Sequence, residues 1–292
     1  MSSSPLRFRF IELPLELQRE IFLASGLEDI NNATRLVCVS KRAYNWIAPI
    51  IYNMVTLGSE DTALFLRTLA SKPAEFFATH VKCLCLSVSV TPVDAEKILS
   101  ICSGVRRLAF WVNYLSAFPG KSITHLISPL SLRRLSIEAR HLRSLRQSSL
   151  KARAGEDSRW YTNLTHLDIV FWPEDTSLTL PDLTHFRSLT HVGLWQSHRP
   201  VEEKLISEVL DSCKRVQILL VVVHESDMTQ RPCAQDRRVV FMPYPTAVVV
   251  DWEASFTGKP NTWSRAQEAY LAAAKPPNVS DPNGHNSGEI SS

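Results

Sequence analysis

The sequence predicts an α/β solenoid that follows a short helical block near the N-terminus. The first observation is a repeat, in which an apolar triplet returns about every 27 residues from residue 81 onward. The second is the chain between successive triplets, where apolar residues return at helical spacing. The third is a cluster of helix signals over residues 13–52. A chain of 292 residues is long enough to bury such a core without disulfides.

The first predicted element is a helix that begins at Leu13 and Pro14. Proline suits the first helical turn, because its missing N–H would have no partner there anyway. Gly26 is expected to end this helix. Three apolar residues share one of its faces: Leu17, Ile21 and Phe22.

Two further helices are expected in the same block. Asn31 or Asn32 is expected to cap the first of them, over residues 33–38. Ser40 is expected to cap the second, which Pro49 ends. Three helices in about 40 residues make a poor independent core, so this block is expected to lean on a partner or on the next domain.

Two segments of the block carry a resemblance to a known family: LPLELQREIF and RLVCVSKRAYNWIAPIIY. They are similar to an F-box, and in particular to the F-box-like segment of many fungal proteins. In that family the helices dock on a Skp-type adaptor protein. The resemblance implies the following adaptor-facing residues in this chain: Leu13, Pro14, Leu17, Ile21, Phe22, Leu36, Val39 and Trp46.

The strongest pattern in the sequence is Φ-x-x-Φ-x-Φ, in which Φ is an apolar residue. The middle Φ of its six copies falls on Leu84, Leu108, Leu135, Leu167, Val192 and Leu219. Their mean spacing of 27 residues lies within the range of about 20–29 residues that leucine-rich repeats show. Residues 53–252 are therefore expected to form a leucine-rich-repeat-like α/β solenoid.

The register of the repeat predicts which side chains are presented for binding. Strand side chains alternate between two faces, and solenoids bind partners on their concave face. Trp111 and Trp195 are expected to be exposed there. The candidate substrate-binding residues on this ladder are Arg107, Trp111, Arg134, Glu138, His166, Asp168, His191 and Trp195. The last rung is apolar on both faces and is expected to be covered, with residues 239–252 as the candidate segment.

The C-terminal part is expected to close the domain. Residues 239–242 and 247–250 are predicted to be two more strands. Residues 253–274 are predicted to be a loop and a helix that cap the open end of the repeat stack. The two chain ends, residues 1–12 and 275–292, are expected to be flexible.

Composition excludes several classes of protein. Lys and Arg number 32 and Asp and Glu number 29, so a net charge of +3 does not indicate an obligate binder of nucleic acid or of membranes. No apolar run approaches the length that spans a bilayer, and residues 1–10 lack a secretory apolar core. A cytoplasmic or nuclear location is expected, where the six cysteines stay thiols.

No motif for catalysis, for a cofactor or for a metal is present in the sequence. The nine glycines form no phosphate-binding loop, and Cys83 with Cys85 has no second ligand pair nearby. His166 and His191 occupy equivalent repeat positions, which explains both without chemistry. The sequence therefore indicates a non-enzymatic protein.

Together, the F-box resemblance and the repeats imply the substrate-receptor subunit of a Skp–cullin–F-box ubiquitin ligase. In that family the F-box docks the adaptor, the repeats hold a protein substrate, and other subunits carry the catalysis. Two alternatives stay open. One is a repeat-based interaction scaffold in which the helical block is only a structural cap. The other is a nucleic-acid binder that uses residues 133–159, where eight Lys or Arg accompany three Asp or Glu.

Overall fold

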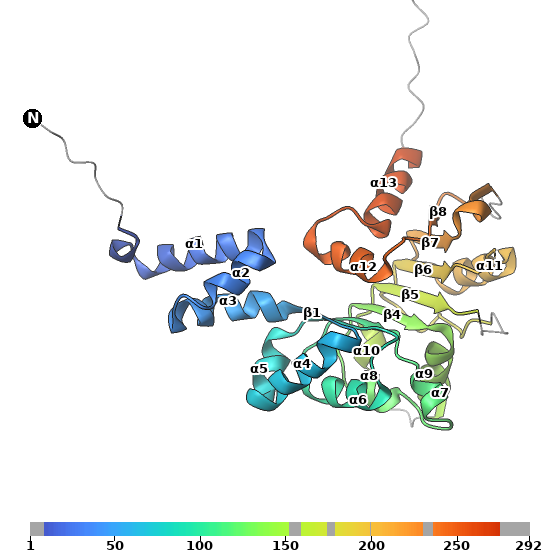
Figure 1. Ribbon diagram of the computed structural model, residues 1–292. Helices are drawn as coiled ribbons and strands as arrows, with labels where there is room; N and C mark the ends of the chain where they lie inside the picture. The colour runs from blue at the N-terminus through green and yellow to red at the C-terminus, as the bar shows by residue number, and fades with distance from the viewer. Residues whose placement is uncertain (1–8, 152–158, 174–178, 199, 230–235, 275–292) are drawn as a thin grey trace, which may run out of the picture.

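The computed structural model describes residues 9–151, 159–173, 179–198, 200–229 and 236–274. Its centre is one sheet of eight parallel strands, in which each strand pairs with the next one along the chain (Figure 1). The predicted α/β class is therefore confirmed. The strands are β1 (Met54–Leu57), β2 (Cys83–Leu86), β3 (Arg107–Phe110), β4 (Arg134–Glu138), β5 (His166–Phe171), β6 (His191–Gln196), β7 (Ile218–Val223) and β8 (Val239–Pro243).

The sheet aligns the six predicted triplets. The middle apolar residues pair with one another from strand to strand: Leu84, Leu108, Leu135, Leu167, Val192 and Leu219. A shift of one residue would turn the apolar row of a strand to the opposite face, so burial of this row fixes the register. The predicted positions of these six strands are confirmed.

One strand was not expected from the sequence. β1 precedes the first predicted triplet and pairs Val55 with Leu84. Its own triplet begins with a tyrosine, as Tyr52-x-x-Val55-x-Leu57. Tyr52 itself lies in the last turn of the helix that precedes β1, and not in the sheet. The centroid of its ring lies 5.1 Å from that of Phe76.

One face of the sheet is covered by the helices that connect the strands (Figure 1). These are α4 (Ser59–Ser71), α5 (Ala74–His80), α6 (Pro92–Ile101), α7 (Tyr114–Ala117), α8 (Thr124–Ile127), α9 (Ala139–Lys151), α10 (Arg159–Thr162) and α11 (Glu203–Ser212), while a 3-10 turn, η2 (Glu225–Thr229), precedes β8. Phe77, Ile98, Trp160 and Val209 from these helices are fully buried in the main core. The apolar row of every strand faces this core.

The opposite face of the sheet is covered by the two C-terminal helices, α12 (Val248–Thr257) and α13 (Thr262–Ala274) (Figure 1). α13 contacts β7 and β8, whereas α12 reaches β1 at the other end of the sheet. The expected helix from Thr262 is confirmed, but its expected place at the end of the stack is wrong. Its apolar side packs on the sheet face, because that face is itself apolar.

Residues 247–250 do not form the predicted strand, since they begin α12. A short run of β-branched residues does not by itself distinguish a strand from a buried helix. Val248, Trp252 and Phe256 are spaced four residues apart, and all three belong to the cluster that packs on the sheet. This helical spacing decides the conformation.

The N-terminal block projects from the β1 end of the sheet (Figure 1). It consists of η1 (Phe10–Glu12), α1 (Leu15–Glu28), α2 (Ile30–Leu36) and α3 (Lys41–Asn53). The three α-helices pack on one another, and α3 makes the main contacts with the rest of the chain, at α5 and β1.

Three expectations about helix ends in this block are wrong. α1 continues through Gly26, which packs against α3: a Cβ there would lie 3.0 Å from Ile47 Cδ1. Asp29, not an asparagine, caps α2 by accepting the Asn31 N–H at 3.0 Å. α3 continues through Pro49 to Asn53, since packing of its last turn on α5 outweighs one lost hydrogen bond. The Ser40 cap is confirmed, with the Ala43 N–H at 3.1 Å.

A substitution at Gly193 tests the close contact between β5 and β6. A Cβ at this position would lie 2.3 Å from Asp168 Oδ1 and 2.7 Å from Trp195 Nε1. We expect Gly193→Ala to lower the free energy of unfolding by about 2–3 kcal/mol in urea denaturation, because the strand must shift or the hydrogen bond must break.

The matched control is Gly58→Ala, whose added Cβ would meet nothing closer than 3.7 Å. We expect it to cost less than about 1 kcal/mol. Equal losses for the two variants would contradict the proposed crowding at Gly193.

Candidate protein-interaction surfaces

Exposed apolar side chains gather on the N-terminal block. Seven large apolar residues are exposed there, against five in all the other described residues. The seven are Ile11, Leu15, Leu17, Ile21, Leu27, Ile30 and Val39. Such a concentration on a small element makes this surface a candidate for binding another protein. We call these seven residues the apolar surface of the block.

The structure divides the predicted adaptor-facing residues into two groups. Leu17 and Val39 are 51% and 64% exposed, and Ile21 and Pro14 are also exposed. The others are half-buried within the block: Leu13, Phe22, Leu36 and Trp46. The Phe22 ring lies 5.8 Å from the Trp46 ring in an edge-to-face contact, which joins α1 to α3. The exposed group is free to touch a partner, and the half-buried group holds the helices together.

The second predicted surface, the ladder on the sheet, is covered by α12 and α13. Trp111 and Trp195 are only 6% and 7% exposed, so the expectation that they are exposed is wrong. The Trp111 Nε1–H donates to Ser136 Oγ at 2.9 Å. The alternation of side chains along a strand shows only that these residues lie on the face opposite the main core. It does not show which segment covers that face.

Glu138 is also buried, at 1% exposure. Its Oε2 accepts a hydrogen bond from Arg140 Nε at 2.6 Å and lies 2.9 Å from His141 Nδ1. The Leu115 N–H donates to the other ring nitrogen of His141, Nε2, at 3.3 Å. Glu138 thus ties β4 to the start of α9 and is not presented to a substrate.

The two ladder histidines meet the C-terminal helices through Trp263. The His166 and His191 rings stack with centroids 4.2 Å apart, and Trp263 lies edge-on 5.7 Å from each. Burial, assisted by the nearby charge of Arg134, lowers the pKa of His166 to about 2 and also lowers the pKa of His191. Both rings are therefore neutral in the folded protein at physiological pH, as the stack requires.

Asp168 is the polar centre of this contact. Its Oδ1 accepts the Trp195 Nε1–H at 2.9 Å and the Trp263 Nε1–H at 3.2 Å, which joins β6 and α13 to β5. Burial raises the pKa of this carboxyl to about 6, although the two indole hydrogen bonds and Arg134 oppose the rise and Asp251 adds to it.

The two ladder arginines contact α12. The guanidinium carbons of Arg107 and Arg134 lie 5.1 Å and 5.4 Å from the centre of the Phe256 ring, within the range of cation–π contacts. Together with Trp252 and Trp263, Phe256 is a residue at this face that sequence reasoning did not assign. Its helical spacing from Val248 and Trp252 is the signal that identifies it.

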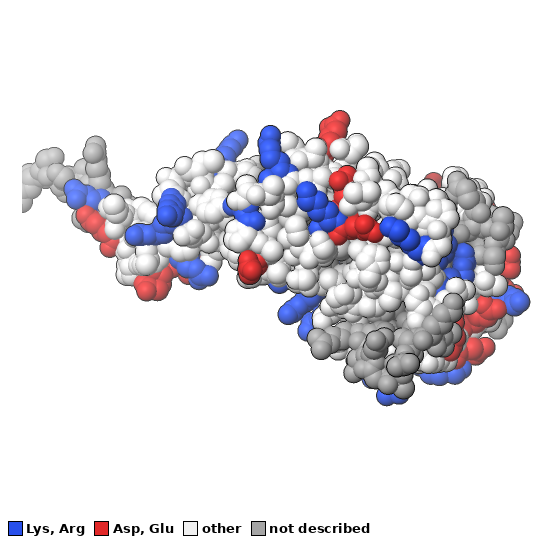
Figure 2. All heavy atoms as spheres, turned by 90° about the horizontal axis from the view of Figure 1, so that it is seen from below, with Lys and Arg blue, Asp and Glu red and all other residues white. Residues whose placement is uncertain are grey.

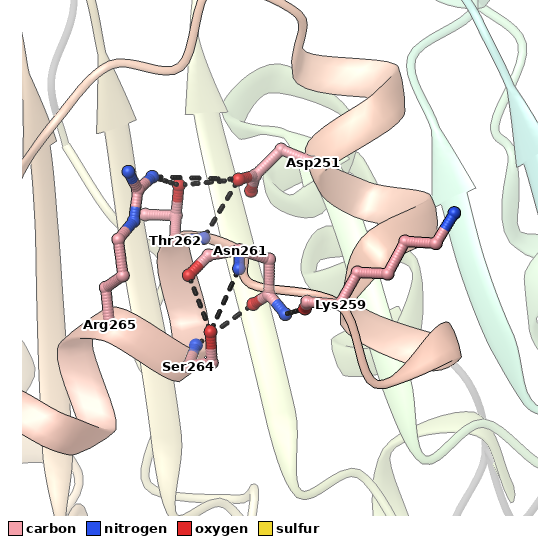
Figure 3. Close-up of polar contacts among 6 residues, drawn as sticks. All are labelled: Asp251, Lys259, Asn261, Thr262, Ser264 and Arg265. Atoms are coloured by element: carbon pink, nitrogen blue, oxygen red, sulfur yellow. Dashed lines mark hydrogen bonds and ion pairs between the residues drawn. The ribbon is translucent and has the colours of Figure 1, made fainter.

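A network of side-chain hydrogen bonds fixes α12 and α13 relative to each other (Figure 3). Asp251 Oδ1, on α12, accepts from the N–H and the hydroxyl of Thr262 at 2.9 and 3.0 Å. Arg265 Nη2 lies 3.8 Å from the same oxygen. These contacts join the two helices that cover the sheet.

The turn between these helices is closed by its own caps (Figure 3). Gly258 ends α12 with a φ of 73°, a left-handed conformation that suits glycine. Asn261 and Ser264 bond reciprocally: the Asn261 N–H donates to Ser264 Oγ at 2.9 Å, and the Ser264 N–H donates to Asn261 Oδ1 at 3.0 Å. Asn261 Nδ2 also donates to the Lys259 carbonyl at 2.8 Å.

The basic run over residues 133–159 does not gather into one patch in the part of it that the structure describes. Arg134 lies beneath α12, Arg140 pairs with Glu138, and Arg146 is 5% exposed. Figure 2 shows positive and negative side chains interspersed on the face seen from below.

The described residues bear on the expectations about cysteines, metal sites and membrane spans. Five cysteines are free, and burial raises the pKa of Cys102 and of Cys213 to about 12, so these thiols are unreactive. Cys233 lies outside the described residues. Within the described ranges, no cluster of potential ligands could hold a metal ion, and no helix has the length and apolar character to cross a membrane.

No protein-family model matches this sequence, and no curated protein matches it either. The F-box resemblance and the ligase function stay predictions.

Titration of Asp168 tests the contact beneath α13. Because the folded state raises the pKa of this carboxyl, it favours the protonated form. The carboxyl therefore stabilises the fold fully below about pH 4, and this contribution is lost as the pH rises through about 6. Asparagine keeps an oxygen acceptor for both indoles and does not ionise. We expect Asp168→Asn to be more stable than the native chain at pH 7.5, by about 2 kcal/mol, and equally stable at pH 4.

Urea denaturation at both pH values measures this difference. The comparison between the two chains isolates Asp168, because the acid destabilisation from the neutral His166 and His191 is common to both. A variant that is less stable at pH 7.5 would show that the charge of Asp168 is needed.

Proposed function

We propose that this protein is a non-enzymatic substrate-recognition subunit of a Skp–cullin–F-box ubiquitin ligase. One observation supports this most: the apolar surface lies on a small helical block that projects from the body and contacts it mainly through α3. A block of this size needs a partner to bury that surface. In this proposal the partner is a Skp-type adaptor, which Leu17, Ile21 and Val39 contact, and the protein acts in the cytoplasm or nucleus.

The finer architecture in this proposal is a leucine-rich-repeat-like solenoid. The sequential order of the parallel strands and the constant register of the triplets support it. A protein substrate would bind the repeat domain. If it uses the predicted ladder residues, it must first displace α12 and α13, since these helices now contact the same side chains.

The alternative is an interaction scaffold in which the block is a structural cap. The packing of α3 on α5, and the direct passage of α3 into β1, favour this alternative. The two proposals differ in what the exposed side of the block does, so exposed residues separate them.

The test is co-expression with the Skp adaptor of the source organism, followed by size-exclusion chromatography and titration calorimetry. We expect a one-to-one complex. The combined variant Leu17→Ser, Ile21→Ser, Val39→Ser should weaken it at least 100-fold, because three anchors lose apolar contact. All three side chains are exposed, so the melting temperature should change little.

The matched control is Leu64→Ser, Val93→Ser, Leu271→Ser, which removes three apolar side chains of similar exposure outside the block. This variant should bind the adaptor like the native chain. A folded native chain that forms no complex would overturn the ligase proposal and leave the scaffold.

A further inference from the structure

An apolar cavity lies between the sheet face and α12. Its volume is about 180 Å³. Its walls are mainly aromatic and aliphatic, and the residues that define it best are Trp111, Val170, Trp195, Val249, Trp252 and Trp263. A comparable apolar cavity of about 150 Å³ in another protein stays dry and binds benzene. The space beneath α12 therefore suits one compact ring.

The charged groups at the cavity differ in what they already bind. Asp168 accepts from two indoles, and Asp251 accepts from Thr262, so both carboxylates are engaged. Arg134 also lines the cavity and is half-buried. Within the described residues its guanidinium faces the Phe256 ring and forms no hydrogen bond or ion pair. Burial lowers the pKa of this guanidinium, the nearby charge of Arg107 adds to the effect, and the charge of Asp168 opposes it.

We propose that this cavity binds a compact aromatic molecule that carries one carboxylate. The ring occupies the space among the tryptophans, and the carboxylate pairs with Arg134. Planar guanidinium and carboxylate groups form strong paired hydrogen bonds, which supply the partner that Arg134 lacks. This site does not depend on adaptor binding.

The cavity and a wider cleft meet at Phe256. This side chain lines both the cavity and a wider cleft between the N-terminal block and α12. Ile50 and Val250 line the same cleft from its two sides. In the proposal, the ligand enters from this cleft past Phe256, whose ring contacts the Arg134 guanidinium.

The test measures binding of four named probes to the full chain by titration calorimetry and ligand-observed NMR. Benzoate and indole-3-carboxylate carry the charge, and benzamide and indole-3-carboxamide are their neutral counterparts. We expect each acid to bind at least ten times more tightly than its amide. Arg134→Gln should reduce this ratio to about one. Arg106→Gln changes an exposed arginine that does not line the cavity, and it should keep the ratio.

Filling the cavity supplies the second arm. Val249→Trp should abolish binding of all four probes. If the Val249→Trp variant does not fold, Ser255→Leu fills the cavity from the same helix and is used instead. Three results would overturn the proposal: no binding of either acid at millimolar concentration, equal binding of acids and amides, or an unchanged ratio in Arg134→Gln.

Discussion

The hydrogen bonds to Asp168 join three parts of the molecule that are far apart in the sequence. One carboxylate oxygen accepts a hydrogen bond from the indole of Trp195 on β6 and another from the indole of Trp263 on α13. The strands on either side of β5 are kept in register by the apolar row of the repeat. The C-terminal helices do not pair with a strand, so no such register positions them. They are positioned instead by the hydrogen bond of Trp263 to Asp168 and by the cation–π contacts of Phe256 with two arginines, Arg107 and Arg134. The opposite face of the sheet is closed because these contacts exist.

This closure changes how the ladder residues are understood. On a bare sheet, the tryptophans, arginines and histidines of the middle strands would form an exposed recognition surface. In the folded chain they contact α12 and α13, and the burial that results keeps His166 neutral and raises the pKa of Asp168. The incomplete filling of the same interface leaves the cavity at Arg134. Substrate recognition and small-molecule binding at this face would therefore both act through α12.

The N-terminal block has the opposite character. Its helices have an internal core of Phe22, Trp46 and Ala33, yet they leave a row of aliphatic side chains in water. The sheet domain buries its apolar residues within the chain, whereas the block leaves several of its own exposed. An adaptor that covers this surface would complete a core that about 40 residues do not complete alone.

The sequence by itself determined the six central strands, their register and the helical nature of the block, because each depends on the local spacing of apolar residues. It also identified Ser40 as a cap, since capping needs only residues three apart. It did not determine the ends of α1 and α3, because Gly26 and Pro49 are placed by packing on other helices. Only the tertiary structure decided that α12 and α13 cover the ladder. That contact joins Asp168 to Trp263, 95 residues later, and no local periodicity records a pairing over such a distance.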